Sequence, residues 1–309
     1  MNHSVITLRG PTASGKTNLA ITLSDKLPLE IISVDSVMVY RGLNIGSAKP
    51  DKKTLDNYPH HLIDICDPNV NYSLGSFYED ANQKIRVILN KGKIPILVGG
   101  TMMYFNALIK GLSDLPTSDN VIRKKIEDEA DEVGWPELHR RLSKIDPVSS
   151  LKIKPNDKQR IQRALEVYEL SGKPLSTFFQ EDRKNLDYEF FNISLFPDDR
   201  QNLYQRIEAR FNQMLDLGLV NEVKELLNRP ELSSSHNSMK SIGYKEICAF
   251  IEDKQTLVEA KEKSILATRR LAKRQLTWLR SLDDSYKLNT FDNDLNKKLY
   301  NLIIEEIKH

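Results

Sequence analysis

Gly10-Pro11-Thr12-Ala13-Ser14-Gly15-Lys16-Thr17 is the stretch from which the fold of this 309-residue chain can be predicted. It fits the pattern G-x-x-x-x-G-K-[ST], follows the strand-like run Val5-Ile6-Thr7-Leu8 and precedes a helical pattern. Because the N–H groups and dipole at the start of a helix favour an anion, the stretch predicts a phosphate-binding loop. All eight residues are candidate phosphate ligands. Lys16 can reach the terminal phosphate, and the Thr17 hydroxyl is placed for a Mg²⁺ ion.

Composition limits the class of protein. Apolar residues make up 39% of the chain and charged residues 28%, which is typical of a globular protein. No run of about 18 apolar residues could span a bilayer, and the chain does not start with a secretory signal pattern. Cys66 and Cys248 form no C-x-x-C arrangement, which disfavours a disulfide framework and a zinc site. We therefore predict a cytoplasmic protein that makes no membrane contact, and we expect a monomer.

Further strand-like runs follow the loop, and polar residues stand where two of them end. The runs are 30–34, 94–98 and 191–196. The first ends at Asp35, and the second runs into Gly99-Gly100-Thr101. Since ligands of an open parallel sheet bind at the carboxyl ends of its strands, Asp35 and Thr101 should face the phosphate loop. Asp35 is the candidate general base; alternatively it caps the next segment or holds Mg²⁺ through water. Thr101 could hydrogen-bond a substrate.

This order of strands and helices predicts an α/β fold, with a P-loop NTPase-like parallel sheet flanked by helices. The core would comprise residues 1–112 and 151–228. Residues 113–150 are rich in charge and predict a small helical insertion, interpreted as a lid, and residues 229–309 predict a helical C-terminal region. Helical spacing of apolar residues is clearest at 76–90, 200–217, 219–228, 244–251, 257–282 and 292–307.

Several basic side chains are candidates for binding an anion. Arg206 and Arg210 lie one turn apart on the predicted helix 200–217, a spacing that suits a diphosphate clamp or pairing with acids such as Glu208. Lys49 falls in a Gly- and Pro-containing loop region and is interpreted as solvated. The pair His60-His61 has no carboxylate or Cys at ligand spacing, so no metal site is predicted there.

Two further stretches are basic. Residues 260–280 contain one acid, Glu262, against seven Lys and Arg: Lys261, Lys263, Arg269, Arg270, Lys273, Arg274 and Arg280. With Trp278 on the same predicted helix, this excess favours a nucleic-acid partner over a merely solvated face. Lys158, Arg160 and Arg163 crowd the first turn of another predicted helix, where cations oppose the helix dipole. Either an anionic partner or a solvated helix end would explain them.

Together these segments resemble the tRNA dimethylallyltransferases, the bacterial isopentenyl-tRNA transferases. The resemblance runs nearly end to end and rests on the order and spacing of the stretches 10–17, 33–36, 40–50, 98–101, 159–165, 242–246 and 272–280. Two departures stand out. Met102-Met103 precedes Tyr104 where Gly-Leu is usual, and Val37-Met38 replaces a more usual Ala-Gln after Asp35-Ser36.

The resemblance implies transfer of a dimethylallyl group from dimethylallyl diphosphate to tRNA, with release of diphosphate. The acceptor would be the exocyclic N6 amine of the adenosine 3′-adjacent to the anticodon, in tRNAs that read codons beginning with U. Asp35 and Thr101 would be catalytic, and Lys16, Mg²⁺ at Thr17, and Arg206 or Arg210 would neutralise the leaving diphosphate.

The same resemblance implies that the insertion contacts the tRNA anticodon stem-loop. The residues implied to bind tRNA are Asp35, Ser36, Val37, Met38, Gln159, Arg160, Ile161, Gln162, Arg163, Lys245, Arg270, Lys273 and Arg274. The main rival is a small-molecule kinase, with ATP in the loop and Asp35 activating an acceptor hydroxyl. A third class, a nucleic-acid-stimulated NTPase, is disfavoured because the sequence lacks a convincing apolar strand that ends in the Asp typical of such enzymes.

Overall fold

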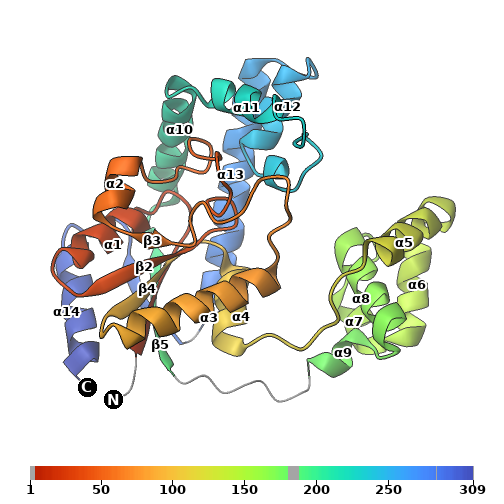
Figure 1. Ribbon diagram of the computed structural model, residues 1–309, viewed down its shortest axis with the longest axis horizontal. Helices are drawn as coiled ribbons and strands as arrows, with labels where there is room; N and C mark the ends of the chain where they lie inside the picture. The colour runs from red at the N-terminus through yellow and green to blue at the C-terminus, as the bar shows by residue number, and fades with distance from the viewer. Residues whose placement is uncertain (1–3, 180–187, 283, 309) are drawn as a thin grey trace. The chain divides into compact units, whose positions relative to one another are not determined.

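The computed structural model describes residues 4–179, 188–282 and 284–308, and its elements form two compact units (Figure 1). One unit comprises residues 1–109 and 186–309, and the other comprises residues 110–185. Within the described ranges, no helix has both the length and the apolar character needed to cross a membrane. The first three residues, on which the cytoplasmic prediction partly drew, lie outside the described residues.

The first unit is built on a six-stranded parallel sheet in the order β3-β2-β4-β1-β5-β6. Its strands are β1 (Ser4–Arg9), β2 (Leu29–Val34), β3 (His60–His61), β4 (Ile94–Gly99), β5 (Glu189–Phe196) and β6 (Tyr286–Asn289). The central strands form where the sequence has short apolar runs, because strands covered on both faces bury every second side chain on each side. The predicted parallel α/β sheet is thereby confirmed.

Helices cover both faces of this sheet (Figure 1). Leu19 of α1 (Lys16–Ser24) and Leu299 of α14 (Leu295–Lys308) pack against Ile6 and Leu8 of β1 on one face. Phe77 of α3 (Leu74–Asn90) and Phe105 of α4 (Met102–Lys110) pack on the other. The short helix α2 (Lys52–Asn57) precedes β3. The strands are therefore packed between two apolar layers, and polar residues lie at the carboxyl ends of the strands.

A third apolar cluster joins the C-terminal helices to the loop that follows β2. Its helices are α10 (Arg200–Asp216), α11 (Leu219–Leu227), α12 (Tyr244–Ile251) and α13 (Leu257–Arg280), with a 3₁₀ turn at Ser238–Lys240. Phe211, Tyr244 and Leu276 pack there with Leu43. Thr256 and Glu259 exchange hydrogen bonds at the start of α13, a capping box that fixes where this helix begins. The helical C-terminal region matches its predicted elements, except that β6 was not predicted.

The second unit is entirely helical. It contains α5 (Asn120–Val133), α6 (Trp135–Ile145), α7 (Pro147–Lys152), α8 (Lys158–Ser171) and α9 (Leu175–Phe178) around a core that includes Ile126, Leu138 and Leu165. The helical insertion is therefore larger than the predicted 113–150. Its boundary differs because the apolar side of α8, assigned to the sheet domain from the sequence, packs against α5 and α6 instead.

Candidate active site

The phosphate loop lies between β1 and α1, as the sequence pattern predicts. Gly15 has φ +80, in the left-handed region, and a Cβ on Gly10 would lie 2.9 Å from Ser14 Oγ. Lys16 Nζ folds back over the loop and donates to Pro11 O at 2.7 Å and Ser14 Oγ at 3.2 Å. The loop thus keeps an open turn at the positive end of α1, where an anion is favoured.

Lys16 is half-buried and lies near the charges of Arg210 and Asp35. Burial and the nearby charge of Arg210 lower its pKa to about 7, while Asp35 opposes the shift. A polyanion next to Lys16 would restore the charged ammonium, because an opposite charge stabilises the protonated form. Electrostatics therefore favours binding of a phosphate group next to Lys16.

The two arginines of α10 have different environments. Arg210 Nη1 donates to Thr12 Oγ1 at 3.3 Å, and Nη2 donates to Ser47 O at 3.4 Å. Burial lowers the pKa of Arg210, and Asp35 opposes that shift. Arg206 is exposed, with its guanidinium 4.6 Å from the centroid of the Phe291 ring. Both line the same cavity, but it is Arg210 that bonds to the phosphate loop.

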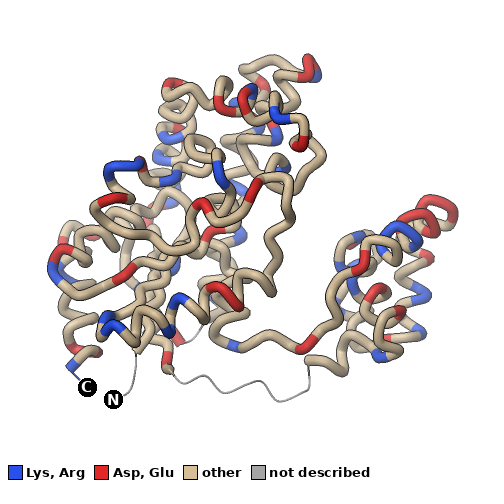
Figure 2. Tube along the Cα trace, in the orientation of Figure 1, with Lys and Arg blue, Asp and Glu red and all other residues tan. Residues whose placement is uncertain are grey.

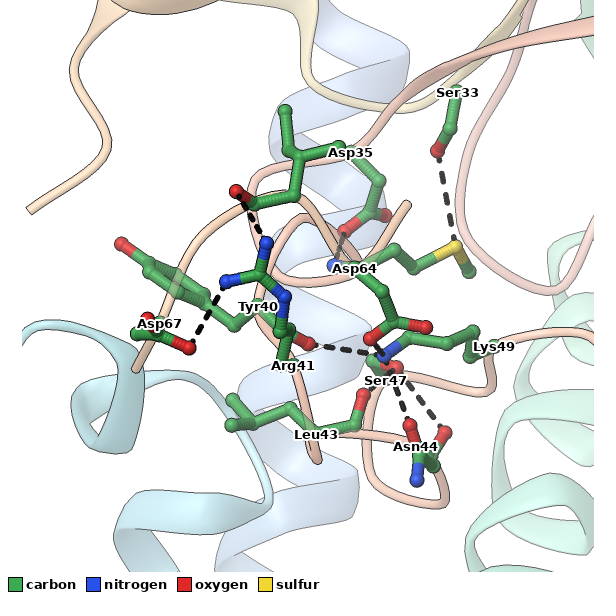
Figure 3. A network of polar contacts seen from close by, with 12 residues as sticks. Ser33, Asp35, Tyr40, Arg41, Leu43, Asn44, Ser47, Lys49, Asp64 and Asp67 are labelled. Carbon is green, nitrogen blue, oxygen red and sulfur yellow. Dashed lines mark hydrogen bonds and ion pairs between the residues drawn. The ribbon is translucent and has the colours of Figure 1, made fainter. Parts of the chain in front are cut away.

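Asp35 follows β2 directly and faces the same cavity. Figure 3 shows its carboxylate. Its Oδ1 accepts hydrogen bonds from the backbone N–H groups of Val37, at 2.8 Å, and Met38, at 3.1 Å. The capping role weighed from the sequence is therefore present. Neither of these bonds uses Oδ2, so one carboxylate oxygen can accept a proton while the other holds the turn.

The end of β4 lies beside the end of β2. A Cβ on Gly99 would lie 2.0 Å from Val34 O, so only glycine allows the two strand ends to approach this closely. The Thr101 N–H donates to Val34 O at 3.3 Å, and Thr101 begins the turn into α4. This contact brings Thr101 into the cavity that Asp35 and Lys16 also line.

A cavity of about 1560 Å³ joins these groups at the carboxyl ends of the strands. Its polar part contains the phosphate loop, Asp35, Thr101 and Arg210. Apolar side chains line it as well: Ile31, Met38, Val98, Met102, Met214 and Trp278. The arrangement can bind a phosphorylated group beside an apolar one, with a carboxylate between strand ends available for proton transfer.

Oxygen donors for a magnesium ion are present on the cavity wall. The Thr17 hydroxyl and the Asp35 carboxylate both line it, and Mg²⁺ prefers oxygen ligands and usually takes only one or two from protein beside substrate phosphates. The donor set therefore fits Mg²⁺. Across the described ranges, no group of three or more His, Cys, Asp and Glu side chains could hold a metal. His61 instead lies 2.8 Å from Glu30 at the opposite end of β2.

Lys49 is not the solvated side chain that we predicted. Its side chain is 3% exposed, and Nζ donates to Tyr40 O and Asn44 Oδ1, both at 2.9 Å, and to Asp64 Oδ1 at 2.6 Å (Figure 3). The prediction was wrong because the loop folds back on itself and surrounds the ammonium with acceptors. From α11, Glu222 accepts the backbone N–H groups of residues 44–46, so a cation and a carboxylate together hold this loop.

Gln275 of α13 was not among the predicted site residues. Its amide bonds to Thr12 in the phosphate loop and to Gly100 after β4. The sequence did not identify it, because a glutamine on a helix with a basic flank is normally interpreted as facing solvent. A buried amide with partners in two loops can be identified only from the structure.

The basic residues of α13 differ in exposure. Arg270, Lys273 and Arg274 are exposed, and Arg274 lines the cavity with Trp278. Arg269 instead pairs with Glu208 at 2.9 Å. Basic positions recur along this helix in Figure 2. Three exposed cations on one flank and an exposed tryptophan form a surface suited to a phosphate backbone and a base.

Ser36 and Val37 also line the cavity, whereas Lys245 is exposed on α12 and does not line it.

In the second unit, the residues proposed to bind tRNA have different environments. Gln159 and Arg160 are exposed at the start of α8. Ile161 is fully buried, so its side chain holds the helix in the core. Gln162 bonds to Arg123 O and Glu127, and Arg163 bonds to Glu166 and Pro116 O. Acidic residues gather on the C-terminal half of α5 (Figure 2), which disfavours RNA on that side of the unit.

Known proteins resemble this chain over almost its full length. Residues 38–282 match the family described as IPP transferase. The chain is 51% identical over 295 residues to the tRNA dimethylallyltransferase of Coxiella burnetii, with 95% of each chain covered. It is 47% identical over 317 residues to tRNA dimethylallyltransferase 2 of Hahella chejuensis, covering 98% of this chain and 96% of the relative.

Solved structures are similar as well. The full-length tRNA isopentenylpyrophosphate transferase of Bacillus halodurans is 37% identical, with a TM-score of 0.72, and covers 99% of this chain and 97% of its own. A eukaryotic dimethylallyltransferase, solved as crystallographic snapshots of the enzyme acting on tRNA, is 29% identical with a TM-score of 0.83. That match covers 98% of this chain and 78% of the eukaryotic one.

Proposed function

The chain belongs to the IPP transferase family, and we propose that it transfers a dimethylallyl group from dimethylallyl diphosphate to tRNA. The acceptor that we propose is the N6 amine of the adenosine on the 3′ side of the anticodon, in tRNAs that read codons beginning with U. We further propose that the protein acts as a monomer in the cytoplasm.

One observation carries this proposal: the cavity combines a phosphate loop with an apolar wall. A diphosphate would bind at Lys16 and Arg210, and the five-carbon allyl group would lie against side chains such as Met38 and Val98. Apolar contact favours a hydrocarbon chain beside the phosphates. The kinase alternative has no support among the relatives, which are tRNA dimethylallyltransferases and tRNA isopentenylpyrophosphate transferases.

The chemistry follows from the charges on this wall. The bond between the allylic carbon and the diphosphate oxygen breaks, and a new bond forms between that carbon and the amine nitrogen. Lys16 and Arg210 stabilise the negative charge that grows on the leaving diphosphate. The amine proton passes to Asp35, whose Oδ1 is held by the Val37 and Met38 N–H groups. Thr101 orients the amine.

Thr17 and Asp35 would hold Mg²⁺ in this site. When bound, the ion neutralises phosphate oxygens and keeps the diphosphate in one orientation. Asp35 then has two candidate roles, proton acceptor and magnesium ligand, which a variant can separate.

An RNA base inside a stem-loop cannot reach the cavity while it is stacked. The adenosine would leave its stack and enter between the end of β2 and α13. Arg270, Lys273 and Arg274 would contact the RNA backbone, and Trp278 could stack on a base. Gln159 and Arg160 of the second unit are further candidates for backbone contacts.

The decisive experiment compares prenyl transfer with phosphoryl transfer. Purified protein is incubated with labelled dimethylallyl diphosphate and unmodified tRNA, and label in the RNA is measured beside ATP turnover. We expect label in tRNA that reads U-initial codons and none in tRNA lacking the acceptor adenosine. ATP turnover without label in RNA would overturn the proposal in favour of the kinase.

A further inference from the structure

Gln275 of α13 is a buried side chain that contacts both loops of the candidate site. Its Oε1 accepts the backbone N–H of Thr12 at 2.9 Å, and its Nε2 donates to Gly100 O at 2.8 Å. The residue is 7% exposed. One side-chain amide therefore satisfies a donor in the phosphate loop and an acceptor in the turn that leads to Thr101.

The space around this amide is closely filled. A Cβ on Gly100 would lie 2.5 Å from Gln275 Nε2 and 3.2 Å from Gly10 O. The two loops therefore approach each other with the glutamine amide between them and no room for a methyl group. Because packed groups of this kind resist small displacements, the amide fixes the separation of the loops.

Only an amide of this length provides both bonds. Glutamate keeps an acceptor for the Thr12 N–H but has no proton to donate to Gly100 O, and methionine has a similar length but provides neither bond. Either change would leave a buried backbone group without its partner, which costs free energy and allows the loops to shift.

Other contacts meet at the same place. Arg210 bonds to the Thr12 hydroxyl, so Thr12 is held through its backbone by α13 and through its side chain by α10. The neighbouring Arg274 and Trp278 of α13 line the cavity. A shift of Thr12 would thus move the anion site relative to Thr101 and Asp35, on which the acceptor is aligned.

We propose that Gln275 is a positioning residue for the transfer reaction, which holds the diphosphate in line with the acceptor amine. This inference rests on the proposed function. It assigns to Gln275 no contact with either substrate, so its loss should affect the rate of the chemical step more than substrate affinity. A misplacement of about 1 Å can reduce a rate by about a hundred-fold.

The test compares Gln275→Met and Gln275→Glu with the wild type. In single-turnover transfer at saturating substrates, we expect Gln275→Met to lower the rate by about ten- to hundred-fold. The rate of Gln275→Glu should lie between those of the wild type and Gln275→Met. For the uncharged Gln275→Met, the dissociation constants for inorganic diphosphate and for tRNA should change by less than about two-fold. Thr268→Ala is the matched control, because it removes a hydroxyl bond inside the same helix, to Ser264 O at 2.8 Å, away from the cavity.

The outcomes separate this inference from the function on which it rests. If the wild type transfers the allyl group and Gln275→Met does so at the wild-type rate, Gln275 does not position the reaction. The inference is also overturned if Gln275→Met changes only the binding constants. The same holds if its rate falls no further than that of a Thr268→Ala variant that is equally destabilised. If the wild type itself transfers no allyl group, the proposed function fails instead.

Discussion

The Nη1 atom of Arg210 lies 3.3 Å from the hydroxyl oxygen of Thr12, and this contact joins α10 to the phosphate loop. Arg210→Ala should therefore weaken binding of inorganic diphosphate by about 1.5–3 kcal/mol, or roughly ten- to hundred-fold, which is typical of a hydrogen bond to a charged group. Calorimetry measures the constant. The matched control is Arg206→Ala, whose guanidinium lies over Phe291. Equal losses in the two variants would show that both arginines clamp the diphosphate.

Lys49 stabilises the loop between β2 and β3. Lys49→Met removes a buried ammonium from Tyr40 O, Asn44 Oδ1 and Asp64 Oδ1, and we expect it to lower the free energy of unfolding by about 1–3 kcal/mol. Water reaches Asp64, whose side chain is 41% exposed, and this limits the cost. Urea unfolding measures it. The control Lys124→Met breaks an exposed pair with Asp128 and should leave the midpoint unchanged. Equal midpoints for both variants would contradict the structural role of Lys49.

The difference between Lys49 and the phosphate loop shows what the sequence can predict. Residues 10–17 form a loop by their own spacing, and the strands on either side are apolar runs, so local patterns predict this part of the site. Lys49 takes its partners from three points of a folded loop, and Gln275 bonds to residues 263 and 175 positions away. Contacts of that range depend on the tertiary fold.

The same distinction explains the errors in element prediction. Strand β6 is four residues long and half exposed at a sheet edge, so it lacks the apolar run that identifies β2. The sequence also predicted the α8 helix correctly but not its unit. An apolar helix face shows that something packs on it, without showing whether the partner is a sheet or α5.

The Lys16 ammonium predicts a pH dependence of anion binding. Its pKa is about 7 in the free site, and bound diphosphate raises that pKa, so binding takes up a proton above pH 7. Affinity should therefore fall as pH rises from about 7, by up to about ten-fold per unit from this group. Lys16→Arg stays charged and lacks this component. Calorimetry in buffers of different ionisation enthalpy measures the uptake, and equal proton uptake in both proteins would contradict the assignment.

Folding without ligand should show the complementary sign. The unfolded chain carries Lys16 at its ordinary pKa of 10.5 and the folded chain at about 7, so the unfolded state binds more protons in between. Because of this lysine, the free energy of unfolding therefore rises as pH rises from about 7 to 10.5. Below about pH 7, the gain from this lysine is absent. Lys16→Met should remove that part of the pH dependence in urea unfolding.

The exposed flank of α13 predicts a dependence of tRNA binding on salt. Replacing Arg270, Lys273 and Arg274 with Ala should weaken binding and flatten the slope of log affinity against log salt by about 0.7–0.9 for each phosphate that the variant no longer neutralises. Filter binding over a series of salt concentrations measures the slope. Lys297→Ala, an exposed lysine on α14, is the control. A slope that stays unchanged in the triple variant would make these residues an ordinary solvated helix face.

The last prediction separates the two candidate roles of Asp35. The carboxylate stands at the end of β2, with Oδ1 bonded to the N–H groups of Val37 and Met38. Asp35→Asn retains an oxygen that can accept those two bonds but cannot take up the amine proton, and general base catalysis contributes about 10²–10⁴-fold. The single-turnover rate should fall by about that factor while diphosphate and tRNA affinities stay near wild type. If Asp35→Asn instead loses magnesium-dependent diphosphate binding and keeps its rate at saturation, the carboxylate is a metal ligand. Another group must then take the proton, because the Thr101 hydroxyl is too weak a base to replace it.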